Sequence, residues 1–112
     1  MTPIVAGGEV IYEMTHGMSL KGQSIAYLRL KSGMTTHPHY HVPDNFEEVY
    51  TIVSGQGVMT LDNETFNVKA PSSVVIKSKV VHRLYNPYDE DVVVVVSCSP
   101  PWTPACEKDV DE

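Results

Sequence analysis

The chain has 112 residues, a hydrophobic share of 42% and a formal net charge of −6, values that fit one folded globular domain and exclude a disordered chain. The acidic balance argues against a nucleic-acid surface, which needs clustered lysine and arginine. Because the N-terminus lacks a basic and apolar leader, and no apolar stretch approaches about 18 residues, we expect a soluble cytoplasmic protein with no membrane partner.

Short segments rich in valine, isoleucine, tyrosine and threonine follow one another along the chain, with turn residues between them. This pattern is typical of β-strands. A turn is expected around Gly55, and another at 62–64, where Asn63 can take a left-handed conformation. The predicted strands are 9–14, 23–31, 47–53, 57–61, 65–70, 73–77, 80–86 and 91–99. They indicate an all-β barrel or sandwich.

The C-terminal third contains a run of five valines, 92–96, which cannot form a half-solvated strand because alternation would place polar residues on the wet face. Both faces of this strand should be covered, and a second subunit is one way to cover the outer one. Cys98 is expected to be buried. Trp102 is expected to seal one end of the barrel. The acidic tail, 107–112, lacks packing residues and is expected to be frayed.

Histidines gather in the segment before the third predicted strand. Side chains alternate along a strand, so His39 and His41 point the same way and Tyr40 points to the opposite face. His37 has the same parity, but Pro38 can interrupt the strand there. Two adjacent imidazoles suit Zn, Fe, Mn, Ni or Cu. The alternative is an ordinary polar sheet edge, because short motifs often match by chance.

Two glutamates, Glu47 and Glu48, follow a few positions later. They face opposite sides of their strand, so only one of them can join the histidines as a carboxylate ligand. Strand parity alone leaves open which one.

This segment resembles the first motif of the cupin superfamily, which reads glycine, five residues, HxH, three or four residues, glutamate, six residues, glycine. Gly33, His39 and His41 match it in order and spacing, and the spacing to Gly55 assigns Glu48 as the ligand. The chain departs from the motif in having six residues between the second histidine and this glutamate. Lengthening a loop costs only about 0.6 kcal/mol per doubling, so the site can survive, and the loop can form part of the pocket mouth.

The second cupin motif reads glycine, five residues, PxG, two residues, histidine, three residues, asparagine. Here Pro71, Lys77 and Lys79 stand at the glycine, proline and glycine positions, while His82 and Asn86 match. If Lys79 keeps the left-handed conformation of a glycine, it stores strain of about 1–2 kcal/mol. A turn of another type is the alternative.

The resemblance implies a single cupin domain over 1–112 with its core at about 20–99, folded as a small antiparallel jelly-roll β-barrel. It implies one divalent transition metal ion (Fe, Mn, Zn, Ni or Cu) held inside one end of the barrel. Cupins of this size are often homodimers. The residues to which the resemblance assigns the metal are His39, His41, Glu48 and His82.

Strand parity extends the predicted site into a mostly apolar pocket. Tyr50 and Ile52 share the face of Glu48, and Leu84 shares the face of His82. Tyr50 can donate its hydroxyl proton to substrate or bound water, unless it is only a core aromatic residue. His37 can act as a base near the rim, or it is a solvated loop residue.

The strand at 23–31 leaves two alternatives. If Arg29 and Tyr27 face inward, they contribute polar groups that bind substrate; if not, Leu28 and Leu30 fill the barrel, which is the better choice on burial grounds. Arg83 points away from the pocket, so Arg29 is the one arginine that could clamp an anionic substrate from inside.

We therefore expect a metal-dependent enzyme that acts on a small oxygen-rich organic molecule, by oxygenation or by lyase, isomerase or cyclase chemistry. Three imidazoles and one carboxylate would leave a divalent ion with open positions for water, dioxygen or a chelating substrate. One alternative is a non-catalytic module that binds a metal or a small ligand. Another is an enzyme that uses the same histidines as acid and base without a metal.

Overall fold

The computed structural model describes residues 3–6, 8–16, 18 and 22–110, and within these residues the chain consists almost entirely of β-strands. None of the described residues belongs to a helix that is long and apolar enough to span a membrane. The elements in chain order are β1 (Ile4–Ala6), β2 (Glu9–Glu13), β3 (Ser24–Leu30), β4 (His39–His41), β5 (Glu47–Ser54), β6 (Gln56–Leu61), β7 (Glu64–Lys69), β8 (Ser72–Lys77), β9 (His82–Tyr85), β10 (Val92–Ser99), the 3-10 helix η1 (Pro104–Cys106) and β11 (Glu107–Asp109).

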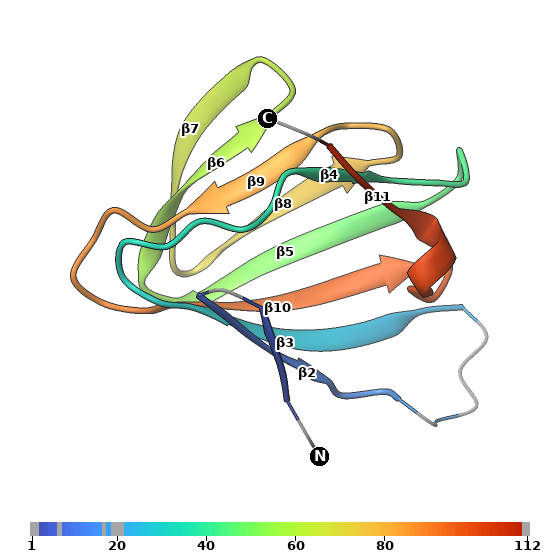
Figure 1. The fold of residues 1–112 in the computed structure, drawn as a ribbon, viewed down its shortest axis with the longest axis horizontal. Coiled ribbons are helices and arrows are strands. Elements are labelled where there is room, and N and C mark those ends of the chain that lie inside the picture. The colour runs from blue at the N-terminus through green and yellow to red at the C-terminus, as the bar shows by residue number, and fades with distance from the viewer. Residues whose placement is uncertain (1–2, 7, 17, 19–21, 111–112) are drawn as a thin grey trace.

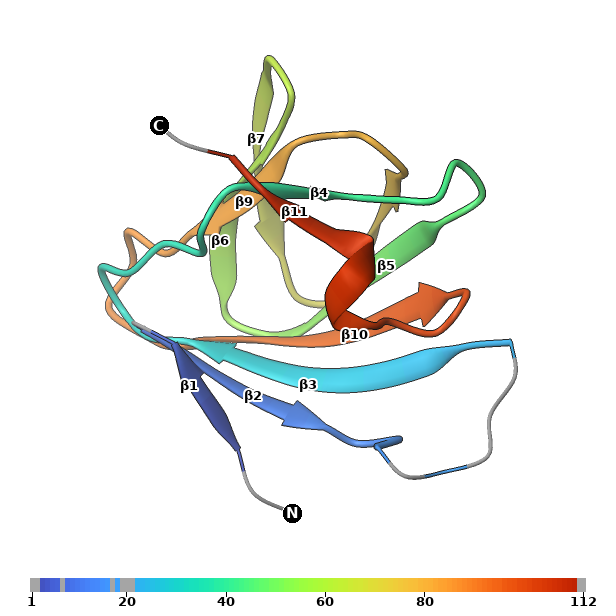
Figure 2. The same ribbon diagram turned by 45° about the vertical axis from the view of Figure 1, so that its right-hand side comes forward.

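The strands form two sheets that face each other and enclose the interior (Figures 1 and 2). The larger sheet has the order β1-β2-β3-β10-β5-β8, and the smaller has the order β11-β4-β9-β6-β7. All of the paired strands run antiparallel. This is the antiparallel all-β architecture that the sequence predicts.

The core lies between the inner faces of the two sheets. Leu30 and Ile52 from the larger sheet and Met59 and Leu84 from the smaller sheet are fully buried there. The valine strand β10 lies between β3 and β5 in the larger sheet, so its backbone is paired on both sides. Four of its five valines are buried and Val95 is partly buried, as expected for a strand covered on both faces.

Backbone conformation explains the turn residues. Gly55, between β5 and β6, has φ of 78°, and a Cβ atom there would lie 2.5 Å from the carbonyl oxygen of Asp91. The turn between β6 and β7 places Asp62, with φ of 51°, in the left-handed region, so the prediction of Asn63 for that position is wrong. Lys79 has φ of 66° and so keeps the conformation that the cupin motif gives to a glycine.

Two strands were not expected from the sequence. β1 pairs with β2, and β11 pairs with β4, with Glu107 opposite His41 and Asp109 opposite His39. The expectation of a frayed tail is therefore wrong for residues 107–109, because backbone pairing to β4 holds them in place. Residues 111 and 112 lie outside the described part of the chain.

Candidate metal centre

Three strands from both sheets bring four candidate ligands together. β4 carries His39 and His41, and β9 lies beside it with His82 directly opposite His39. Glu48 comes from β5 in the facing sheet. Because residues two apart and residues directly opposite each other share a face, the three histidines line one wall and Glu48 approaches from the other.

The four side chains converge closely enough to hold one ion. One ligand atom from each of His39, His41, Glu48 and His82 lies within 4.8 Å of those from the others. Oε1 of Glu48 is 3.0 Å from Nε2 of His82 and 3.8 Å from Nδ1 of His41. Three nitrogens and one carboxylate oxygen are a ligand set that suits a divalent transition metal.

Backbone carbonyls orient two of the imidazoles. Nδ1 of His39 lies 2.8 Å from the carbonyl oxygen of His37, and Nδ1 of His82 lies 3.0 Å from that of Val80. Since a carbonyl can only accept, each Nδ1 carries the proton in these contacts and the Nε2 lone pair is left to face the site. Metal-binding histidines are commonly oriented in this way by their second ring nitrogen.

Burial provides a test of whether these residues fit a metal. His41, Glu48 and His82 are 2%, 4% and 1% exposed. His41 Nε2 has no hydrogen-bond partner, and Glu48 Oε1 and His82 Nε2 lie 3.0 Å from each other and have no other partner, although an unpaired buried polar atom is costly. A divalent cation bound among these residues would neutralise the buried carboxylate and accept the imidazole lone pairs, so the residues fit the ion that the fold implies.

The electrostatics of the site follow from its burial. Burial lowers the pKa of His39, and the charge of neighbouring His82 lowers it further. For His82 burial also lowers the pKa, but contact with the Glu48 carboxylate outweighs this effect and the pKa is raised. Burial, followed by the charge of Glu48, raises the pKa of Tyr50 well above its ordinary value. Tyr50 therefore keeps its hydroxyl proton at neutral pH.

Two further residues support the ligands. The thiol of Cys98, on β10, donates to Oε2 of Glu48 at 3.5 Å, which leaves Oε1 facing the histidines. The ring of Phe46 stacks on His41, with centroids 4.6 Å apart and an interplanar angle of 19°. Phe46 belongs to the loop that is longer than the cupin motif allows, and it is 1% exposed. The loop therefore contributes a buried support for His41, and none of its residues 42–46 lines the cavity.

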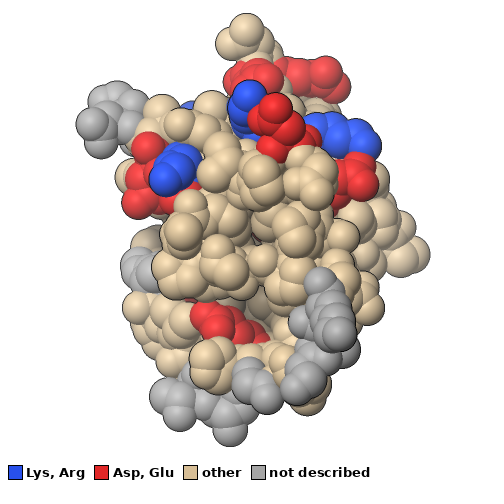
Figure 3. Space-filling view, turned by 90° about the vertical axis from the view of Figure 1, so that its right-hand side faces the viewer, with Lys and Arg blue, Asp and Glu red and all other residues tan. Residues whose placement is uncertain are grey.

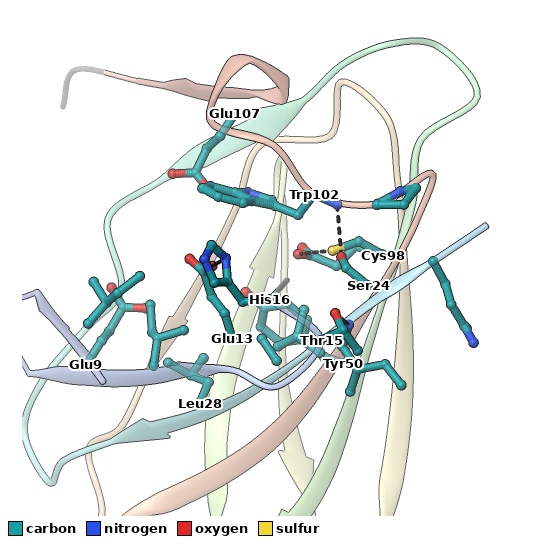
Figure 4. A pocket seen from close by; sticks show the side chains of 18 of the residues that line it. Glu9, Glu13, Thr15, His16, Ser24, Leu28, Tyr50, Cys98, Trp102 and Glu107 are labelled. Atoms are coloured by element: carbon teal, nitrogen blue, oxygen red, sulfur yellow. Dashed lines mark hydrogen bonds and ion pairs between the residues drawn. The ribbon is translucent and has the colours of Figure 1, made fainter. Parts of the chain in front are cut away.

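A cavity of about 540 Å³ opens beside the candidate ligands, a volume typical of small-molecule sites. Figure 4 shows Tyr50, Leu28 and Trp102 on its walls, together with polar groups from β2 and from the C-terminal segment. Its described lining includes five carboxylates and neither lysine nor arginine. Figure 3 shows acidic atoms within the hollow at this end of the molecule. The acidic residues that line the cavity are Glu9, Glu13, Glu48, Glu107 and Asp109.

Of the other residues predicted to lie near the substrate, some line the cavity and others lie in the core. Tyr50 and the exposed His37 line the cavity. Ile52 and Leu84 face inward, as parity predicts, but each lies further along its strand from the ligands, in the closed core. Trp102 lines the cavity and is partly buried against the core.

The alternative in which Tyr27 and Arg29 face inward is wrong. Leu28 and Leu30 are 3% and 0% exposed on the inner face, so their neighbours point outward. Arg29 donates to the Tyr27 hydroxyl at 3.2 Å and lies 3.9 Å from Asp91, outside the cavity. No arginine is available to clamp an anion there, since Arg83 is also exposed and outside the lining.

Sequence reasoning missed two acidic residues of the site. Glu107, in the tail, has an oxygen 3.6 Å from Nε2 of both His39 and His41. Glu9, on β2, is partly buried in the cavity wall; burial, reinforced by Glu107, raises its pKa to about 7. The alternation in 9–14 could have indicated that Glu9 faces inward with Ile11, whereas no local signal brings the tail to β4.

Comparison with known sequences identifies relatives across most of the chain. A family model described as Cupin domain matches residues 26–98. The uncharacterized protein MJ1618 of Methanocaldococcus jannaschii is 34% identical over 102 residues, which cover 89% of this chain and 80% of that protein. The uncharacterized protein SCO3923 of Streptomyces coelicolor is 33% identical over 81 residues, covering 72% of this chain and 73% of that protein.

Solved structures with the same fold are more distant in sequence. A variant of Streptomyces PAC13 with uridine superimposes with a TM-score of 0.82 at 16% identity, covering 97% of this chain and 83% of that one. Pac13 is described as a nucleoside dehydratase. KdgF from Halomonas sp. gives a TM-score of 0.74 at 18% identity, covering 87% and 84% of the two chains. At such identities the likeness is one of fold.

Proposed function

The chain belongs to the cupin domain family, and from this premise we propose that it is a metal-dependent enzyme acting on a small, oxygen-rich organic molecule. The observation that carries the proposal is the convergence of His39, His41, Glu48 and His82, whose ligand atoms lie within 4.8 Å of one another beside a cavity of substrate size. His39, His41, Glu48 and His82 would hold a divalent transition metal ion such as Fe, Mn, Zn, Ni or Cu.

When bound, such an ion polarises a carbonyl or enediol oxygen, and a redox-active metal can also support oxygenation. The chain's own groups would orient the substrate and handle its protons. Tyr50 keeps its proton because burial raises its pKa, so its hydroxyl can donate a hydrogen bond into the cavity. His37 lies at the exposed rim, where an imidazole can exchange protons with solvent. Trp102, which also lines the cavity, would offer an apolar surface to the substrate.

The charges in the cavity narrow the substrate class. Besides the candidate ligand Glu48 and Glu9, whose pKa is about 7, the carboxylates of Glu13, Glu107 and Asp109 line it with no described lysine or arginine, so a phosphate or carboxylate group on the substrate would be repelled by the walls. A neutral or cationic molecule with several hydroxyl or carbonyl groups fits this lining. The uridine in the Streptomyces PAC13 structure is an uncharged ligand of this kind.

Turnover assays on matched substrate pairs test this proposal. The protein is loaded with each candidate metal in turn and incubated, with and without dioxygen, with neutral sugars and nucleosides and with their phosphorylated forms. We expect conversion of neutral compounds only, and its loss in Glu48→Gln, which removes the charge of the carboxylate ligand. Exclusive conversion of the phosphorylated forms would contradict the proposed substrate class. Saturable binding without conversion under any condition would support a non-catalytic binding module instead.

A second candidate is acid–base catalysis without a metal, and the 3.0 Å contact between Glu48 and His82 favours it. Such a pair can pass a proton to or from a substrate in the cavity. Activity that survives exhaustive chelation and metal analysis would support this candidate. Activity that disappears on chelation and returns with added metal would support the metal-dependent enzyme.

We also propose that the protein forms a homodimer through the outer face of the larger sheet. Val53 on β5 and Val75 on β8 are 49% and 52% exposed on this face, which also carries the partly buried Val95 of β10, opposite Thr51 of β5. Covering these valines would remove apolar area from water.

A further inference from the structure

The C-terminal strand β11 adds acidic side chains to the edge of the histidine wall. It runs antiparallel to β4, with Glu107 opposite His41 and Asp109 opposite His39. Residues directly opposite each other in an antiparallel pair share a face, so both carboxylates face the cavity, and both line it. Lys108, between them, points to the other side of the sheet and is exposed.

Glu107 is close to two of the candidate ligands. Its Oε1 atom lies 3.6 Å from Nε2 of His39 and 3.6 Å from Nε2 of His41. The indole Nε1 of Trp102 donates to the same oxygen at 3.3 Å and so helps to position the carboxylate. In Figure 4 the Glu107 side chain lies next to the Trp102 ring at the edge of the cavity.

The spacing of these atoms resembles that of neighbouring ligands around one ion. Two atoms each about 2.1 Å from a metal lie about 3.0–3.4 Å apart at octahedral or tetrahedral angles. His41 is 2% exposed and its Nε2 atom has no hydrogen-bond partner, so a buried nitrogen points toward this carboxylate with nothing to satisfy it. The Glu107 side chain is 34% exposed, so it can change its rotamer without repacking the core.

We propose that Glu107 is a further ligand of the metal centre, brought to the ion by the C-terminal strand; this inference rests on the proposed metal site. With neutral histidines and two carboxylates, Glu48 and Glu107, a divalent ion would carry no net charge. Such a centre holds its ion more tightly than one with a single carboxylate and attracts anionic ligands less, in agreement with the acidic walls of the cavity.

The test compares Glu107→Gln with Asp109→Asn in the full chain. Glutamine keeps an oxygen that can accept from Trp102, and Asp109→Asn removes the same charge from the same face of the same strand at an exposed position. Co²⁺ is titrated into each metal-free protein against a competing chelator, and the visible absorption of the bound ion is recorded. Thermal unfolding checks that each variant is folded.

We expect Glu107→Gln to weaken Co²⁺ binding by about 10- to 100-fold and to change the Co²⁺ absorption, because a ligand has been lost. Asp109→Asn should stay within about threefold of the wild type and keep its spectrum. An affinity for Glu107→Gln within threefold of the wild type would overturn the inference. So would equal losses in both variants, or a loss of affinity with an unchanged spectrum. If the wild type itself binds no Co²⁺, the proposed metal-dependent function fails as well, so the two failures can be distinguished.

Discussion

Replacing Phe46 with alanine tests whether the extended loop supports the metal centre. The ring is 1% exposed and stacks on His41 at 4.6 Å, so its removal leaves a cavity both in the core and beside a ligand. Buried phenylalanine-to-alanine changes cost about 3–5 kcal/mol, a large part of the roughly 5–15 kcal/mol that stabilises a domain. Because His41 would lose its stacking partner, metal affinity should also fall by about tenfold, as for other supports of metal ligands.

Denaturant unfolding of the metal-free protein measures the first effect, and a chelator competition assay measures the second. Phe46→Leu is the matched control, since it keeps most of the buried volume and should cost about 1–2 kcal/mol. A loss of less than 1 kcal/mol in Phe46→Ala would refute the reasoning, because the loop would then not depend on this ring. So would a full loss of stability with unchanged metal affinity, because the stack on His41 would then have no role in holding the ligand.

Three further changes test individual contacts. Burial and Glu107 raise the pKa of Glu9 to about 7 in the folded protein, so ionisation of Glu9 destabilises the fold as pH rises from about 4 to 7. In unfolding experiments without metal, Glu9→Gln should therefore be as stable as the wild type at pH 4 and more stable than it at pH 8. Equal differences at both pH values would contradict this. Cys98→Ala removes the donor to Glu48 and should weaken metal binding by about tenfold in the competition assay, whereas unchanged affinity would show that the thiol does not position the carboxylate. If the proposed homodimer forms, Val75→Lys places a charge on its interface and should convert it to a monomer in light scattering. A monomeric wild type, or a dimer whose mass the substitution leaves unchanged, would contradict the proposed interface.

Strand alternation predicted much of the interior, because it depends only on local backbone geometry. It places Glu48, Tyr50 and Ile52 on the inner face and Glu47 outside, as the structure has them. For 23–31 it allowed two opposite orientations, with either the odd- or the even-numbered residues facing inward. The burial of Leu28 and Leu30 decides between them. Alternation could not tell which inward residues line the cavity, because that depends on their height along the barrel.

The missing part of the site depends on contacts between distant segments. Glu107 reaches His41 through a strand of three residues whose partner lies more than sixty positions earlier in the chain. Three acidic or basic residues carry no alternating apolar signal, so the tail looked unstructured. Lys79 illustrates a different limit, because a left-handed turn that usually takes glycine holds a lysine here, where its backbone N–H donates to the carbonyl of His41.

The central claim is that His39, His41, Glu48 and His82 hold a divalent transition metal ion, and elemental analysis of the purified protein tests it most directly. The wild type is purified without chelators, and its metal content is compared with that of His41→Ala and of His16→Ala, which changes an exposed histidine outside the ligand group. We predict about one equivalent of transition metal in the wild type and in His16→Ala, and its loss in His41→Ala. Full metal content in His41→Ala, or none in the wild type even after incubation with each candidate metal, would contradict the account.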